Sequence, residues 1–177
     1  MVLSAAAGAV EIESSRYPFC FQGEAKDPNA TSGIVEFFPF NQDLNRLTLI
    51  VKNAPAGPVE ITWGKLSKKF DAAELAKGIN LAAEFGVGNP FSEQFARVEQ
   101  IIRNQQNYET TLHKQLLHEM PHNKNLLPEA RDAWDQVAAA AMKRDAVLLG
   151  ESAAAVVPVK HVIKIQPINI AARDPSR

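Results

Sequence analysis

The sequence has a single cysteine, no long apolar run and no excess of charge of either sign. Cys20 is alone and can form neither an internal disulfide nor a thiolate metal site. Nineteen Lys and Arg residues against 20 Asp and Glu residues leave a formal charge of -1, so no overall field favours nucleic acid or an anionic membrane. Charged residues interrupt every apolar stretch before the roughly 18 residues that a membrane span needs. We therefore expect partners other than nucleic acid or membrane.

The chain also lacks a recognisable targeting segment, repeat or low-complexity tract. Residues 1–10 are apolar but have no basic n-region, and the polar run Glu11–Arg16 follows directly, so no signal peptide is expected. Hydrophobic residues make up 46% of the chain and charged residues 22%, which is typical of a soluble globular protein. A length of 177 residues favours one folding unit, residues 1–177.

Strands are predicted for most of the first seventy residues. Short β-branched or aromatic runs occupy Val10–Glu13, Pro18–Phe21, Ile34–Phe40, Leu47–Lys52, Val59–Trp63 and Leu66–Phe70. Gly64-Lys65 separates the last two runs and fits a type II′ hairpin, which prefers Gly first. Apolar residues occupy alternate positions again near the end of the chain, and His161 falls in the same series as Val159 and Ile163. We expect a β-rich part over 8–70 and 156–166.

Helices are predicted for the middle of the chain. Asp71 and Glu74 fit a capping box, which predicts a short helix over 71–78 that ends at Gly78. A helical hairpin is predicted over 90–150. The apolar residues expected to face inward are Phe91, Phe95, Val98, Ile102, Leu112 and Leu116 in its first helix, where Gln105 and Glu109 interrupt them, and Ala130, Trp134, Val137, Ala141 and Leu148 in its second.

Prolines and a glycine are expected to delimit these two helices. Pro90 begins the first helix and Pro121 ends it, while the second helix runs from Pro128 toward Gly150. The fold class is therefore α+β: an antiparallel β meander or partial sandwich with a long antiparallel helical hairpin and a returning C-terminal strand.

The motif His118-Glu-Met-Pro-His122 matches the letters of a zinc protease helix. Two imidazoles one turn apart can share a zinc ion, with the intervening Glu as general base. Pro121 is expected to break the helix between them, and no third ligand follows closely. We interpret His118 and His122 as residues of an exposed helix end and predict no metal and no cofactor.

No nucleophilic site is predicted either. Ser152 in Gly150-Glu-Ser follows a helix, whereas the nucleophile elbow follows a strand. The residues three before His113, His118, His122 and His161 are Thr110, Gln115, Glu119 and Pro158, so no Asp-x-x-His pair exists. No catalytic residue can therefore be proposed.

Four further features of the sequence are considered as functional sites, and none of them is predicted to be one. Cys20, between two Phe residues, is expected to be a buried, inert thiol, and His161 a packing residue rather than a base. Asn29-Ala-Thr31 fits a glycosylation acceptor but has no secretory context. The cluster of Lys65, Lys68 and Lys69 near Trp63 is interpreted as solvated hairpin residues.

The segment from Leu47 to Ala82 resembles the region that follows the catalytic part of bacterial SGNH/GDSL-like hydrolases. It reads LTLIVKNAPAG, then VEITWG, then FDAAELAKGINLA, and the family has a similar hairpin followed by a phrase of the form FxAxELAxGINLA. Asn89-Pro90, the long polar helix and Val157–His161 are also similar. The resemblance covers most of the chain from about Ile34 onward.

The resemblance implies a serine ester hydrolase whose nucleophile and Asp-His blocks lie outside the matched segment. No catalytic residue can be transferred to this chain, which we expect to be inactive alone. A catalytic SGNH domain or a second copy is the expected partner, and the family suggests an exported or periplasmic location. Two alternatives stay open: a stand-alone protein-interaction module, and a zinc hydrolase that uses His118 and His122.

Overall fold

The computed structural model describes residues 1–6, 8–21 and 30–168. The chain divides into two compact units, the first comprising residues 1–95 and 158–177 and the second residues 96–157. The length of the sequence had predicted one folding unit over residues 1–177.

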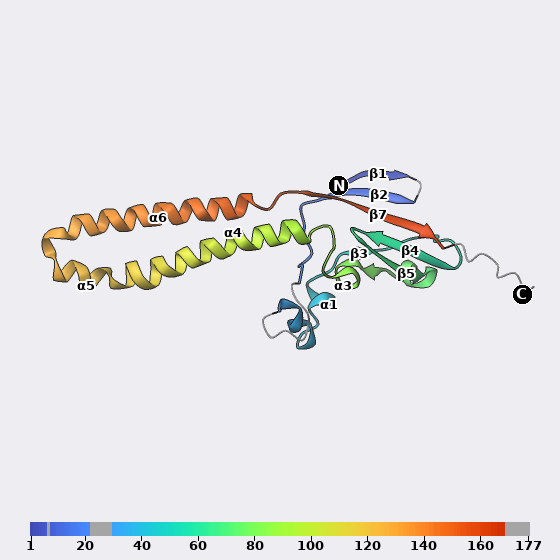
Figure 1. Cartoon of the computed structure of the whole chain (residues 1–177), viewed down its shortest axis with the longest axis horizontal. Helices are drawn as coiled ribbons and strands as arrows, with labels where there is room; N and C mark the ends of the chain where they lie inside the picture. Colours follow the sequence, from blue (N-terminus) through green and yellow to red (C-terminus); the bar gives the residue numbers. More distant parts are fainter. Residues whose placement is uncertain (7, 22–29, 169–177) are drawn as a thin grey trace, which may run out of the picture. The chain divides into compact units, whose positions relative to one another are not determined.

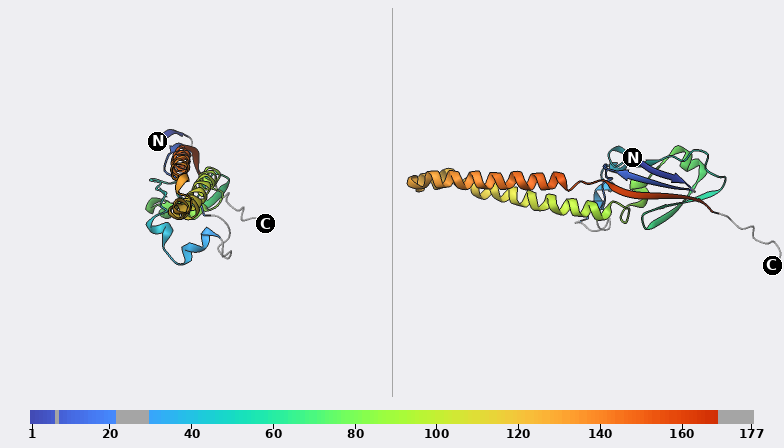
Figure 2. Two further views of the ribbon diagram at one scale, coloured as in Figure 1. Left: turned by 90° about the vertical axis from the view of Figure 1, so that its left-hand side faces the viewer. Right: turned by 90° about the horizontal axis from the view of Figure 1, so that it is seen from above.

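The first unit is built on a five-stranded antiparallel sheet with the order β1-β2-β7-β4-β5 (Figure 1). Its strands are β1 (Val2–Ala6), β2 (Ala9–Ser14), β4 (Pro58–Trp63), β5 (Leu66–Asp71) and β7 (Val159–Pro167). Two local hairpins, β1-β2 and β4-β5, are joined by β7, which pairs with β2 on one side and with β4 on the other. In Figure 2 (right) the red β7 runs beside the blue hairpin. The predicted α+β class, antiparallel sheet and returning C-terminal strand are confirmed.

The sheet is buried on one face only. Along β4 the side chains of Val59, Ile61 and Trp63 are fully buried, while the residues between them are less so. On β7 the buried residues are His161 and Ile163, as the parity of the sequence predicted. Such alternation is typical of an antiparallel sheet with one solvated face.

The β4-β5 turn is confirmed as a two-residue hairpin. Trp63 pairs with Leu66, and Gly64 has a φ of 67° while Lys65 does not have a positive φ, as a type II′ turn requires. The outer strand β5 presents Lys68, which donates to Glu84 Oε2 at 3.0 Å. A charged side chain on an edge strand discourages pairing with another chain.

The predicted strands Pro18–Phe21 and Ile34–Phe40 are wrong. No strand covers 18–21, and the second run is replaced by a 3-10 helix, Thr31–Glu36, followed by α1, Phe40–Asp43. The side-chain amide of Asn45 accepts from the Phe19 N–H at 2.8 Å and donates to the Phe19 carbonyl at 3.1 Å. Because a side chain satisfies these backbone groups, the run needs no strand partner, and Cys20 and Phe21 are buried while Phe19 is partly exposed.

Two smaller differences concern strand length and position. Of the run Leu47–Lys52 only β3, Thr48–Leu49, is a strand, and it pairs with β6, Ile79–Asn80. The strand β1, in residues read only as an apolar N-terminus, was not predicted. Its side chains are all exposed, so no alternation marked it.

Short helices α2 (Ala72–Lys77) and α3 (Leu81–Phe85) cover the buried face. The capping box of α2 is confirmed: the Asp71 N–H donates to Glu74 Oε2 at 2.8 Å and the reciprocal contact is present. Gly78 ends α2 with a φ of 102°, as predicted. Their buried apolar side chains include Leu75, Leu81 and Phe85.

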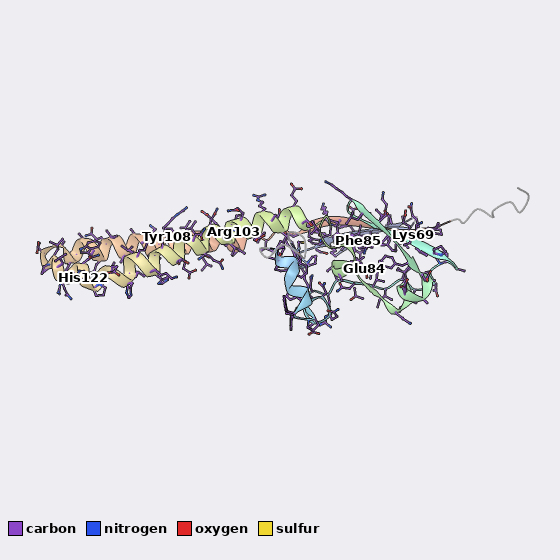
Figure 3. All side chains as sticks on the ribbon, turned by 60° about the horizontal axis from the view of Figure 1, so that its bottom comes forward. Lys69, Glu84, Phe85, Arg103, Tyr108 and His122 are labelled. Atoms are coloured by element: carbon purple, nitrogen blue, oxygen red, sulfur yellow. The ribbon has the colours of Figure 1, made fainter. Side chains whose placement is uncertain are left out.

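The second unit is the predicted helical hairpin. It contains most of α4 (Ser92–Thr111), a π-helix (Leu112–Leu117), α5 (His118–Leu126), a 3-10 turn (Pro128–Ala130) and α6 (Arg131–Ala154). The Tyr108 hydroxyl donates to the Ala141 carbonyl at 3.1 Å and links the two arms. Figure 3 labels Tyr108 on this hairpin.

The prediction that Pro121 ends the first arm is wrong, because α5 continues through it to Leu126. The π-helix ends at Leu117, the residue whose carbonyl the Pro121 ring would meet in a regular α-helix. In the wider turn, bonds span five residues, as between the His118 N–H and the His113 carbonyl. This local change of pitch accommodates a proline that the sequence pattern reads as a stop.

Part of the inward-facing set of residues also differs. Ile102 and Val137 are exposed, whereas their neighbours Ile101 and Ala138 are partly buried. Gln105, read as an interruption, is buried and donates to Glu109 Oε2 at 3.1 Å. The partly buried residues of α6 follow three- and four-residue spacing, typical of a helix seam: Trp134, Ala138, Ala141, Asp145, Leu148 and Ser152.

The expected helix end at Gly150 is also corrected, since α6 continues to Ala154. An added Cβ at Gly150 meets no atom within 4 Å. Gly150→Ala should therefore raise the free energy of unfolding of the hairpin by about 1 kcal/mol, because Ala loses less backbone entropy in a helix. Urea unfolding followed by circular dichroism tests this, with Gly78→Ala, at a positive φ, as the destabilised control. Destabilisation by Gly150→Ala would place a helix end there after all.

Candidate functional site

A serine, a histidine and a tryptophan meet on the buried face of the sheet, at the junction of β2, β7 and β4. His161 lies on β7 and is 5% exposed. Its Nε2 is 3.2 Å from the Ser14 hydroxyl, and its Nδ1 is 3.1 Å from the Trp63 indole nitrogen. The Phe91 ring packs on the imidazole with ring centroids 5.0 Å apart.

The tryptophan determines which imidazole nitrogen carries the proton. An indole N–H can only donate, so His161 Nδ1 must accept the bond from Trp63. A neutral imidazole then holds its proton on Nε2, which donates to the Ser14 oxygen. A serine nucleophile needs the reverse arrangement, in which the histidine nitrogen accepts the hydroxyl proton.

Burial keeps this cluster neutral. Desolvation lowers the pKa of His161 from its ordinary value, so the uncharged ring that accepts from Trp63 is favoured in the folded protein. Both ring nitrogens are engaged by Ser14 and Trp63, which leaves neither free for the orienting carboxylate of a triad. The cluster is suited to packing and not to general-base chemistry.

Neither of the other nucleophile candidates, Ser152 and Cys20, forms a hydrogen bond with a histidine or a carboxylate in the described part of the chain. Ser152 lies inside α6, and its buried hydroxyl oxygen is one of two buried side-chain atoms without a hydrogen-bond partner in the described chain. Cys20 is buried, and desolvation raises the pKa of its thiol, which disfavours the reactive thiolate. Its sulfur contacts the Asn89 amide, whose Nδ2 lies 3.5 Å away.

The histidines of the zinc-like motif lie on the outside of α5. His118 and His122 are both exposed and stand four residues apart on a continuous helix, so the expected break between them does not exist. His118 Nε2 is 3.9 Å from Glu119 Oε1. Across residues 1–6, 8–21 and 30–168, no three His, Cys, Asp or Glu side chains are grouped so that they could hold a metal ion.

The lysine cluster beside Trp63 forms no stacking site. Trp63 is 0% exposed and cannot stack on a ligand beside Lys65, Lys68 and Lys69. Asn29 of the glycosylation motif lies outside the described residues. No helix in the described part of the chain is long and apolar enough to span a bilayer.

A groove in the helical hairpin is the other candidate binding surface. Its volume is about 410 Å³, and it lies where the π-helix faces α6. Its lining contains no charged side chain and consists of Tyr108, Thr111, Leu112, Gln115, Leu116, Asn123, Trp134 and Ala141. The spacing of apolar residues gave no indication of this groove, because the π-helix that widens the turn cannot be read from periodicity.

Sequence reasoning also missed Ser14 and the role of Trp63. The parity of β7 placed His161 on the apolar face, but nothing local to residues 9–14 indicates that β2 pairs with β7. Only that pairing, which sets Ile12 opposite His161, brings the Ser14 hydroxyl to the imidazole.

Comparison with known proteins gives a similarity of fold. No family model matches the sequence, and no curated protein matches it. The solved structure of a gut microbial diltiazem-metabolizing enzyme is similar at 19% sequence identity with a TM-score of 0.56. The similarity covers 90% of this chain and 43% of the enzyme's chain. This chain therefore spans less than half the length of that enzyme, and at this identity the likeness concerns the fold alone.

The buried histidine predicts a specific loss of stability in acid. The unfolded chain takes up a proton on His161 near pH 6.5, whereas the folded protein does so only at lower pH. The contribution of His161 is thus complete above about pH 6.5 and is lost as pH falls through the lowered pKa. Urea unfolding between pH 5 and 7.5 measures it. In His161→Gln, whose amide can accept from Trp63 and donate to Ser14, this part of the pH dependence should disappear.

Proposed function

We propose that this chain is a non-catalytic accessory region of a serine ester hydrolase of the SGNH/GDSL type, contributing to its fold, the covering of its active site or its assembly. The observation that carries the proposal is the proton arrangement at His161. Because Nε2 donates to Ser14, the serine-histidine contact cannot activate the hydroxyl.

The residues that resemble the family support a structural role. The segment Leu47–Ala82 folds into β3, β4, β5, α2 and β6 and enters α3. Its apolar side chains supply much of the core, among them Val59, Ile61, Trp63, Phe70, Leu75, Ile79 and Leu81. Residues that recur in a family because they build a core identify relatives rather than chemistry. The similar structure covers 43% of an enzyme's chain. This is compatible with a structural region that is separate from the catalytic part.

The outer surface of α6 supports a role in contact with another protein. None of its 24 residues is fully buried, although the helix is rich in Ala, Val and Leu. Met142 and Leu149 are 46% and 59% exposed and lie seven residues apart, on the same side of the helix. Apolar side chains gathered on a solvent-facing surface favour an interaction site. We infer that this side of α6 packs against the catalytic domain.

Hydrolysis of p-nitrophenyl acetate tests the absence of a nucleophile. The wild-type chain, Ser14→Ala and Ser152→Ala should release nitrophenol at one common rate, no faster than the urea-unfolded chain, because the folded chain exposes three imidazoles while His161 and Cys20 stay buried. Turnover that is lost in Ser14→Ala or in Ser152→Ala would overturn the proposal. The same assay with a full-length SGNH relative, with and without this chain, checks for an effect on a competent active site.

A stand-alone protein-interaction module is the second candidate, favoured by the edge strand β1, whose five residues are all exposed and whose outer edge has no strand partner in the described sheet. Size-exclusion chromatography with light scattering separates the candidates. A self-sufficient module should elute as a defined monomer or dimer, whereas the accessory region should self-associate until Leu149→Glu removes apolar surface. Gln136→Glu, at an exposed polar position of α6, is the matched control. A monodisperse wild-type chain that Leu149→Glu leaves unchanged would favour the module.

A further inference from the structure

Three of the four histidines of the chain lie on consecutive turns of one helical arm. His118 and His122 are four residues apart in α5, which is one α-helical turn. His113 is five residues before His118, a spacing that would place it on another side of an α-helix. The π-helix changes this. The His118 N–H bonds to the His113 carbonyl, so these two residues are separated by one hydrogen-bonded turn of the wider helix.

All three imidazoles are accessible. His113, His118 and His122 are exposed, and the His118 side chain is 77% exposed. Met120 is buried and lies half a turn from His118 and His122, so both histidines face away from the packed side of the arm. Figure 3 labels His122 on the hairpin. The fourth histidine, His161, is buried with both ring nitrogens engaged.

We propose that this row of histidines binds a divalent transition-metal ion through two imidazoles, with His118 shared by two alternative pairs, His113 with His118 and His118 with His122. Imidazoles one turn apart, about 5.4 Å along the helix, can reach one ion. Nitrogen ligands favour nickel, copper and zinc over magnesium and calcium. Glu119, beside His118, adds negative charge at the same place. Two protein ligands leave the other coordination positions to water, unlike a three-ligand catalytic zinc site.

The shared position of His118 makes a distinctive pattern of variants. Nickel binding is measured by calorimetry on the full chain, with magnesium as the ion that should not bind. His118→Gln removes both pairs and should weaken nickel binding roughly 100-fold, since a single imidazole loses the gain from joining two ligands. His113→Gln and His122→Gln each keep one pair and should weaken binding only about twofold, the statistical loss of one of two sites.

Two further variants complete the test. The double variant His113→Gln/His122→Gln should bind as weakly as His118→Gln, and Lys114→Gln, at an exposed position next to His113, should bind as wild type. Circular dichroism verifies that the helices persist. Nickel binding that is insensitive to His118→Gln would overturn the proposal. Equal, large losses in His122→Gln and His118→Gln would overturn the pairing of His113 across the π-helix. This inference is independent of the proposed function, because no catalytic partner enters the measurement.

Discussion

The antiparallel ladder between β7 and its two neighbours is the interaction on which the first unit depends. Without it the chain would hold two separate hairpins, each with an unpaired inner edge, and isolated two-stranded hairpins are marginal in water. With β7 in place, Ile163 and His161 meet Trp63 from the adjacent strand, and α2 and α3 have a continuous face to cover. The buried imidazole is a consequence of the same pairing, because it enters the core on the apolar parity of β7.

The chemistry of the buried cluster follows from one donor. Trp63 carries an N–H that must be satisfied once the indole is fully buried, and His161 Nδ1 satisfies it. That bond turns the remaining ring proton toward Ser14. A serine and a histidine at hydrogen-bonding distance thus form a structural contact, and proximity alone would have been a misleading sign of a hydrolase site.

Local signals predicted the elements that local chemistry determines. The Asp71-Glu74 capping box, the Gly64 turn and the alternation along β4 and β7 depend on neighbouring residues, and all were confirmed. Elements that depend on distant partners were not predictable. Phe19 lies in a strand-like run, yet Asn45 takes up its backbone groups, and Pro121 lies within a helix because the turn before it widens. The cluster at His161 was predictable only in part for the same reason. The apolar alternation around His161 is a local signal, whereas its partner Ser14 comes from the distant strand β2.

The central place of β7 also bears on how the chain is synthesised. Residues 159–167 leave the ribosome only after both hairpins and the entire helical insert, so the inner edges of β2 and β4 carry open hydrogen-bonding groups throughout translation. Closing the sheet then joins strands separated by about 150 positions in the case of β2, and such long-range pairing is slow. Until β7 pairs, the gap between β2 and β4 stays open to any other strand that can match their hydrogen-bonding groups.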